Sequence, residues 1–367
     1  MPDKLKDIFL TRSTVSDMVD AVEQVYPQFE RQAFEHLVFD GTWEDKELKQ
    51  RMRHLAHCLR QVLPQDYAAA LDILKQAAPS IGGFESIALP EFVGRYGLAH
   101  WELSLPALGF FTRFGSSEYG IRPFLKKDAQ RAMAYMYRWA EDDNLHVRRF
   151  ASEGCRPRLP WGMALPAFQK DPTPILPVLE RLKDDESEYV RKSVANNLND
   201  ISKDHPEWVL DVCERWYGHS ANTDWIVRHA CRGLLKAGNR RALLLFGFAD
   251  PTHIRVENLT LDKETLSIGE DLHYTFELKV NTEEPCKVRL ELGVYYARPT
   301  GKVSRKVFAI REGRFDPGSR LISRKRSFAD QSTRKHHAGE HSISIIVNGV
   351  EMAKASFQLT DRTGHGQ

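Results

Sequence analysis

A short motif that occurs three times constrains the fold of this chain more than any other feature. Its copies are HVRRFA, YVRKSV and IVRHAC, whose valines Val147, Val190 and Val227 are separated by 43 and 37 residues. Repeats of this length, built from paired helices, are typical of HEAT and armadillo solenoids. The helical segments expected before the three copies are 129–140, 175–183 and 207–217. The sequence therefore predicts a stacked helical array in which the second helix of each pair lines one surface.

The hydrophobic period changes from 3.6 to 2 after about residue 250. Two runs of alternating apolar and polar residues are 272–280 and 288–296. Asn348-Gly349 lies between two further apolar runs, and this dipeptide is a strong hairpin signal. About seven short strands in roughly 105 residues favour an immunoglobulin-like β-sandwich. We therefore predict a mainly α protein, with a HEAT-like solenoid over 1–250 and an immunoglobulin-like domain over 254–361.

Composition excludes several classes of protein. Hydrophobic residues make up 42% and charged residues 28% of the chain, no apolar run is long enough to cross a bilayer, and the N-terminal stretch has no export signal. We therefore expect a cytoplasmic protein without a membrane partner. The five cysteines are scattered and lack CxxC spacing, which argues against a disulfide framework and a zinc site and favours buried thiols.

No motif predicts a metal or a nucleotide cofactor. His337-Ala-Gly-Glu340-His341 matches H-x-x-E-H, but a zinc peptidase needs that motif on a helix, and here it leads into the strand-like run SISIIV. Gly82-Gly83 lacks the Lys-Ser/Thr of a P-loop. We expect a protein without cofactors.

Charge is distributed unevenly along the chain. Residues 302–335 contain eleven basic and three acidic side chains, a local net charge of +8 in a chain whose total is +2. This asymmetry favours a polyanionic partner for the C-terminal part. The alternative is a set of solvated basic loops.

The segment His146–Trp161 contains a candidate site. Its apolar stripe, at i, i+3, i+4 and i+7, should face a core, while Arg149 and Glu153 share another face, so we expect the Glu153 carboxylate to point outward. Pro157 and Pro160 stiffen the chain before Trp161. A carboxylate and an indole that are both held in a fixed position would suit a cationic ligand.

A second carboxylate, Glu118, lies in GSSEYGIRPF. Paired carboxylates with an aromatic side chain can stabilise an oxocarbenium ion and orient water, as hydrolysis of a glycosidic bond requires. Two structural alternatives remain open: an Arg149–Glu153 ion pair explains Glu153, and Ser116 or Ser117 with Glu118 could begin a helix.

The three motif copies each place two basic residues on the lining helix. Such a surface could follow DNA phosphates. The first arginine of a pair could instead hold neighbouring repeats together through Asp185, Glu186 or Asp224, whereas the second basic residue is the better candidate for phosphate. The residues concerned are Arg148, Arg149, Arg191, Lys192, Arg228 and His229.

Four longer motifs resemble one family, the AlkC branch of bacterial DNA alkylation repair proteins, which are relatives of AlkD built from HEAT-like repeats. The motifs are SSEYGIRPFL, HVRRFASEGCRPRLPW, YVRKSVANNLNDISKDHP and TDWIVRHACRGLLKAGNRRAL. The resemblance extends over essentially the whole chain, including the immunoglobulin-like domain.

The resemblance implies a monofunctional DNA glycosylase that releases cationic bases, chiefly 3-methylcytosine and 3-methyladenine, from duplex DNA without full base flipping. It implies that Glu118 and Glu153 stabilise the sugar cation and position water, and that Trp161 packs against the deoxyribose or the lesion. The basic residues of the repeats would bind phosphates, and the β-sandwich would add a second contact through Arg324, Lys325 and Arg326.

We expect such an enzyme to act as a monomer on alkylated double-stranded DNA. The competing class is a non-catalytic scaffold that binds nucleic acid or protein through the same two domains. Release of a methylated base from DNA separates the two classes.

Overall fold

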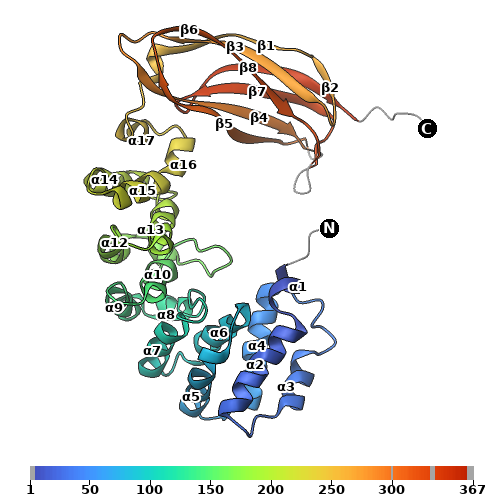
Figure 1. Cartoon of the computed structure of the whole chain (residues 1–367), viewed down its shortest axis with the longest axis vertical. Helices are drawn as coiled ribbons and strands as arrows, with labels where there is room; N and C mark the ends of the chain where they lie inside the picture. The colour runs from blue at the N-terminus through green and yellow to red at the C-terminus, as the bar shows by residue number, and fades with distance from the viewer. Residues whose placement is uncertain (1–4, 299–300, 331–334, 362–367) are drawn as a thin grey trace, which may run out of the picture. The chain divides into compact units, whose positions relative to one another are not determined.

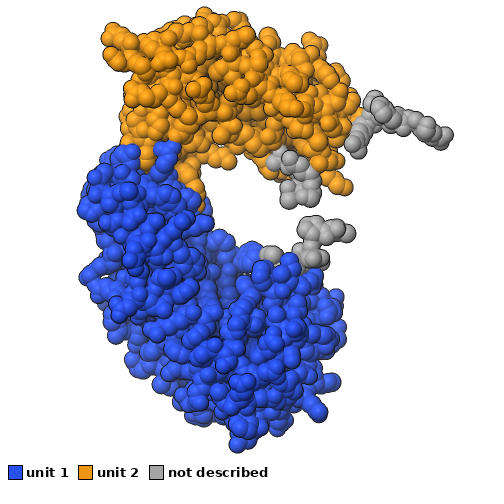
Figure 2. Space-filling model, in the orientation of Figure 1, with its two compact units in different colours: residues 1–230 blue, residues 231–367 orange. Residues whose placement is uncertain are grey.

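The structure is a computed structural model that describes residues 5–298, 301–330 and 335–361. Its contacts divide the chain into two compact units, Met1–Ala230 and Cys231–Gln367 (Figure 2). The strands begin at Ile254, but the two helices before them, α16 and α17, belong by their contacts to the second unit.

The first unit is helical. In chain order its helices are α1 (Leu5–Phe9), α2 (Arg12–Val25), α3 (Arg31–Val38), α4 (Leu48–Val62), α5 (Tyr67–Ala77), α6 (Ala88–Tyr96), α7 (Trp101–Phe111), α8 (Arg122–Lys127), α9 (Ala129–Trp139), α10 (Leu145–Gly154), α11 (Pro166–Lys170), α12 (Leu176–Leu182), α13 (Glu188–Ile201), α14 (Pro206–Trp216) and α15 (Ala221–Ala230). Short 3-10 helices lie at η1 (Ala78–Ser80), η2 (Phe84–Ile87) and η3 (Thr173–Ile175).

The three motif copies form successive helices of one array. Helix α10 packs against α13, and α13 packs against α15 (Figure 1). Each pairs with the helix before it, α9, α12 or α14, at the positions that the helical period predicts. The motif valines Val147, Val190 and Val227 are all buried, because they face the neighbouring helices. The predicted helical repeat is therefore present in the structure.

The second unit contains a two-layered β-structure. After α16 (Arg232–Lys236), α17 (Arg240–Leu245) and η4 (Pro251–His253), its strands are β1 (Ile254–Leu261), β2 (Thr265–Ser267), β3 (Asp271–Val280), β4 (Cys286–Ala297), β5 (Val303–Phe315), β6 (Gly318–Ser327), β7 (Gly339–Val347) and β8 (Val350–Thr360). One sheet has the order β1-β3-β6 and the other β2-β8-β7-β4-β5. Among the paired strands of the described segments, β2 and β8 run parallel and the other pairs are antiparallel.

The two sheets face each other across an apolar core that includes Phe276, Leu290 and Ile345 (Figure 1). The alternation over 272–280 and 288–296 predicted this burial, since every second residue of β3 and β4 points inward. The described segments contain eight strands where the sequence suggested about seven; the three-residue strand β2 is too short to show an alternating pattern.

The Asn348-Gly349 turn joins β7 to β8, as predicted, and also packs on the helices of its unit. Both residues have positive φ, 44° and 79°, which the turn requires. The Asn348 side chain accepts from the backbone N–H of Arg289 (2.8 Å) and donates to the carbonyl of Ala249 (2.7 Å). A Cβ at Gly349 would lie 1.9 Å from the Cα of Gly238, so only glycine fits there.

Four of the five cysteines are buried free thiols and Cys286 is partly buried, in line with the sequence prediction. Within the described segments, no helix combines the length and apolarity that a bilayer span requires.

Candidate active site around helix α10

Helix α10 begins and ends where its sequence dictates. The side chain of Asn144 accepts from the N–H of His146 at 2.9 Å and caps the N-terminus. The helix ends at Gly154, shortly before Pro157. A Cβ at Gly154 would lie 2.9 Å from the Cε of Met136 on α9, so this end of α10 packs closely on its partner helix.

Glu153 does not point into solvent. The expectation of an outward carboxylate was wrong, because the face of α10 that carries it is covered by α13 and by the segment after α10; Glu153 is only 5% exposed. Its Oε1 accepts from Arg156 at 2.6 Å, and its Oε2 accepts from the hydroxyl of Ser193 on α13 at 2.6 Å. The carboxylate is therefore held on both oxygens.

Arg149 joins Glu153 to the second predicted carboxylate. Its guanidinium forms ion pairs with Glu118, which lies in the turn between α7 and α8, and with Glu153, at 3.3 Å. Ser116 donates to Glu118 at 2.5 Å and accepts from Arg149 at 2.8 Å. Burial alone would lower the pKa of Arg149, but Glu153 and Glu118 outweigh it and raise that pKa above its ordinary value.

The charged chain continues beyond the residues that the sequence predicted. Arg156, three residues after Glu153, also binds Asp200 of α13 at 2.8 Å. The alternating order is Glu118, Arg149, Glu153, Arg156 and Asp200. The ammonium of Lys203 pairs with the other oxygen of Asp200 at 2.9 Å. Three carboxylates thus meet two guanidinium groups and one ammonium, so the charges of this largely buried cluster balance.

Trp161 is 61% exposed and has a φ of 61°, a left-handed conformation that bulky residues seldom adopt. Side chains from other elements fix the backbone on both sides of it. The ammonium of Lys49 on α4 donates to the carbonyl of Trp161, the Tyr119 hydroxyl donates to Pro160 at 3.4 Å, and Arg122 donates to the carbonyl of Met163. The sequence predicted a stiff segment from its prolines; the structure adds these three tethers.

The tethers are themselves partly buried. Burial, followed by the nearby Arg53, lowers the pKa of Lys49, and burial lowers the pKa of Arg122 to about 10. Arg122 compensates with donations to the carbonyls of Gly154 (3.1 Å) and Arg156 (3.0 Å). Burial, followed by Glu118, raises the pKa of Tyr119 to about 12, so its hydroxyl stays neutral and able to donate.

A cavity of about 190 Å³ adjoins the carboxylate cluster. Its wall contains two guanidinium groups, the rings of Phe114, His146 and Tyr189, and three small residues. The guanidinium groups are those of Arg113 and Arg149, and the small residues are Thr112, Gly115 and Ser116. The guanidinium of Arg149 lies 5.0 Å from the centre of the Tyr189 ring. The site therefore offers an aromatic surface next to a cluster of carboxylates that are each paired with a basic side chain.

The first arginine of each motif pair has a structural role in two copies. Arg148 donates to the carbonyls of Asp142 and Asp143, and Arg191 donates in the same way to Asp185 and Glu186, at 2.7 to 3.0 Å. Arg148 also binds the Asp185 carboxylate of the next repeat at 2.7 Å. The alternative that this arginine holds repeats together is confirmed for Arg148.

The second basic residues differ from copy to copy. Arg149 is enclosed between two carboxylates, Lys192 is exposed, and His229 stacks on Trp225 with ring centres 5.0 Å apart. Arg228, the first basic residue of the third copy, is also exposed. Fewer than the six basic residues predicted from the sequence are therefore exposed on the surface that could contact phosphate.

The remaining predicted DNA contacts lie on β6, the edge strand of the three-stranded sheet. Arg324 and Arg326 share one face of this strand and Lys325 the other, because side chains alternate. Lys325 pairs with Asp271 at 2.8 Å, while Arg326 covers the ring of Phe308 on β5 at 3.6 Å.

The sequence places Asp200, with Asn196 and Asn197, on the inner face of the next repeat near the site without assigning it a role, and the structure pairs it with Arg156. Sequence reasoning missed Lys49, Ser193 and Arg156. Arg156 could have been predicted, because it follows Glu153 by three residues just after the end of α10, and this spacing brings opposite charges together on a helix. Ser193 lies on α13, and Lys49 lies 112 residues before Trp161, so no local pattern marks these two residues.

Comparisons with known proteins agree with this architecture. A family model described as "DNA alkylation repair enzyme" matches residues 112–234, and one described as the C-terminal Ig-like domain of YhaZ matches residues 255–361. YhaZ of Bacillus subtilis (strain 168) is 42% identical over 356 residues, 97% of this chain and 99% of its own length. The alkylpurine DNA glycosylase AlkC of Pseudomonas fluorescens, in a structure bound to DNA containing an abasic site analog, is 39% identical with a TM-score of 0.90, covering 98% of this chain and 100% of that one.

This chain belongs to the AlkC family of DNA alkylation repair proteins. The match to AlkC includes both units, so the helical array and the C-terminal immunoglobulin-like domain are shared features of the family fold.

Proposed function

We propose that this AlkC-family chain is a monofunctional DNA glycosylase that hydrolyses the N-glycosidic bond of cationic alkylated bases, chiefly 3-methylcytosine and 3-methyladenine, in base excision repair. One observation supports this most strongly. Glu118 and Glu153, which come from different elements, share the guanidinium of Arg149 beside an aromatic cavity. This arrangement occurs in a chain 39% identical to an alkylpurine DNA glycosylase.

The chemistry requires little more than fixed negative charge. An alkylated base already carries a positive charge and leaves as a neutral molecule, so the enzyme need not supply a strong general acid. Positive charge then develops on the deoxyribose, where Glu118 and Glu153 would stabilise it and position the attacking water. Burial of Glu153 increases this effect, because charges interact more strongly away from water.

Trp161 would provide the aromatic contact to the deoxyribose or the lesion. Its indole is exposed while its backbone is tethered by Lys49 and Arg122, so a large apolar surface is presented at low cost in conformational entropy. A fixed outward indole fits engagement of the lesion in a bent duplex without full base flipping.

Binding of alkylated duplex DNA would rest on exposed basic side chains such as Lys192 and Arg228, with Arg324, Lys325 and Arg326 as the contact from the second unit. Such contacts make affinity independent of sequence and sensitive to salt. We further propose that the protein acts in the cytoplasm as a monomer.

The test is release of a methylated base. Full-length protein is incubated with duplex DNA containing a single 3-methylcytosine, without metal or nucleotide, and free base and abasic sites are measured. We expect release with one abasic site per base lost and no strand cleavage. Folded protein that binds this DNA but releases no base would overturn the proposal in favour of a non-catalytic scaffold.

A further inference from the structure

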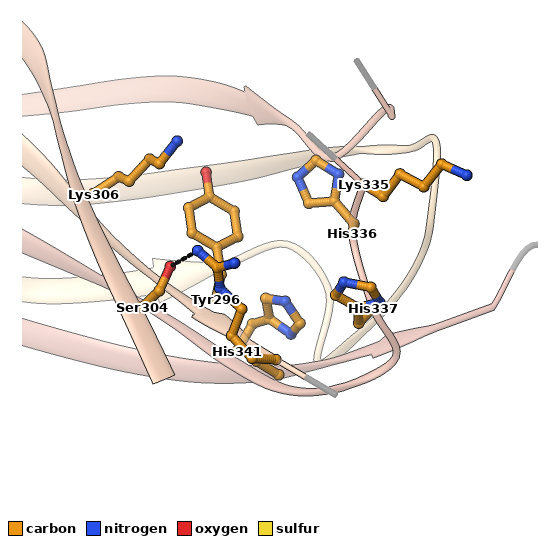
Figure 3. A pocket seen from close by; sticks show the side chains of 9 residues that line it. Tyr296, Ser304, Lys306, Lys335, His336, His337 and His341 are labelled. Carbon is orange, nitrogen blue, oxygen red and sulfur yellow. Dashed lines mark hydrogen bonds between the residues drawn. The ribbon is translucent and has the colours of Figure 1, made fainter. Parts of the chain in front are cut away.

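A pocket of about 200 Å³ lies at one end of the β-sandwich. It is formed by the end of β4, the start of β5 and the segment that enters β7 (Figure 3). The H-x-x-E-H motif contributes His337 and His341 to this pocket.

The described side chains that line the pocket are basic or neutral. Arg298, Lys306 and Lys335 are joined by three histidines, and no carboxylate is among the lining residues. Lys335 extends outward from the other side chains in Figure 3, which places it at the rim. The carboxylate of Asp330 lies next to the pocket, where it accepts from the backbone N–H of His336 at 2.8 Å and lies 3.4 Å from Nδ1 of the same residue. The pocket therefore concentrates positive potential.

The donors are held in place. Arg298 donates to the hydroxyl of Ser304 at 3.1 Å, which fixes its guanidinium (Figure 3). The ring of Tyr296 lies against His336 and His341, with ring centres 5.6 and 6.1 Å apart. His341 is 1% exposed, and its Nδ1 meets the carbonyl of Gly339 at 3.0 Å, while its Nε2 is buried without a hydrogen-bond partner. Because Nδ1 donates to a carbonyl, Nε2 of the neutral ring carries a lone pair and can donate to an anion only when the ring is protonated.

Basic side chains continue from the pocket along the open edge of the sandwich. Lys306 pairs with Val294 and Phe308 with Leu292, so both point to the inner side of β5 and lie about 7 Å apart along the strand. Arg326 of β6 covers the Phe308 ring. The pocket therefore lies at the end of a row of basic side chains, which Lys306 and Arg326 form along this edge.

We propose that this pocket binds a single phosphate group, supplied by the backbone of the DNA that the protein is proposed to repair. The source of the phosphate rests on the proposed function. Guanidinium and ammonium groups contributed by separate segments can bind the several acceptor oxygens of a phosphate. The small volume admits one such group and excludes a base stack, so the contact is independent of sequence.

The test compares two neighbours on β5 in the full-length protein. Lys306→Ala removes a pocket ammonium, whereas Arg305→Ala removes a charge on the opposite face, where Arg305 pairs with Glu351 at 3.5 Å. Binding of an undamaged DNA duplex is measured over a range of salt concentrations, and binding of inorganic phosphate is followed by NMR signals of His337 and His341. Arg298→Ala is a second pocket variant.

We expect Lys306→Ala and Arg298→Ala each to lower the slope of log affinity against log salt by about 1, and Arg305→Ala to leave it unchanged. Phosphate binding that Lys306→Ala abolishes, with an unchanged duplex slope, would overturn the DNA backbone as the source. Equal slopes for all variants without a phosphate response would overturn the pocket itself. Since undamaged DNA is used, neither outcome depends on base release, which tests the glycosylase separately.

Discussion

Helices α10 and α13 are copies of one repeat element. Comparing them distinguishes residues that stabilise the repeat from residues that belong to the candidate site. In both, an arginine at the same motif position donates to two carbonyls of the turn before the helix, Arg148 in α10 and Arg191 in α13. In both, an aspartate of that turn, Asp142 or Asp185, accepts a backbone N–H two residues on, at 2.8 to 2.9 Å. The contacts that both copies share stabilise the helical array.

The copies diverge at three places, and all three belong to the candidate site. Arg149 lies between two carboxylates, whereas its counterpart Lys192 is exposed. Glu153 corresponds to Asn196 in α13. Helix α10 stops after 10 residues and leads to the Trp161 segment, whereas α13 runs for 14. Because the repeat fold does not require these three differences, we infer that they serve the function of the candidate site.

The largest expected effect concerns Glu153. Glu153→Gln keeps the shape of the side chain but removes the charge, so the single-turnover rate of base release should fall at least 10²- to 10³-fold while DNA affinity is kept. Asn196→Asp, which adds a charge at the matching position of α13, should leave the rate within a few fold. Parallel losses of rate and affinity in Glu153→Gln would indicate a purely structural ion pair.

The next effect tests the shared arginines. Arg148→Ala breaks two carbonyl contacts and the Asp185 ion pair, and should lower the free energy of unfolding by about 2–3 kcal/mol in urea titrations. Arg191→Ala should cost less, about 1–2 kcal/mol, because its guanidinium donates to two carbonyls and the substitution does not break the Arg148–Asp185 ion pair. A changed salt dependence of DNA binding with unchanged stability would instead assign these arginines to phosphate.

The Trp161 segment should respond to its tether on α4. Lys49→Ala frees the carbonyl of Trp161, and the loss of one positioning contact should reduce the single-turnover rate about tenfold with little change in affinity for DNA. Lys49→Arg, which keeps a donor, should restore most of the rate. A rate in Lys49→Ala equal to that of the unmodified protein would show that Trp161 does not need this tether.

The smallest effect belongs to Lys192. Lys192→Ala should lower the salt slope of DNA binding by about 1 and leave base release under saturating conditions intact. If the slope is unchanged, the exposed surface of α13 does not meet phosphate.

Much of the fold follows from local patterns in the sequence. The repeated motif predicted the helical array, and alternation with the Asn348-Gly349 turn predicted the sandwich, because helical and strand periods depend on nearby residues. The packing of that turn against Gly238 could not be predicted, since it depends on how distant segments meet.

The candidate site was predictable in its residues but not in its geometry. Glu118, Glu153 and Trp161 stand out in the sequence, but the sequence suggested an outward Glu153, and the structure buries it under Ser193 and Arg156. A helical wheel shows which residues share a face, whereas only the neighbouring helix determines whether that face is covered.

A crystal structure of this protein with duplex DNA containing an abasic site tests the account most directly. The abasic deoxyribose should lie against Glu118, Glu153 and Trp161, with its C1′ within contact distance of a carboxylate oxygen. A deoxyribose bound elsewhere on the protein, with the Glu118–Arg149–Glu153 cluster still closed and away from DNA, would contradict it.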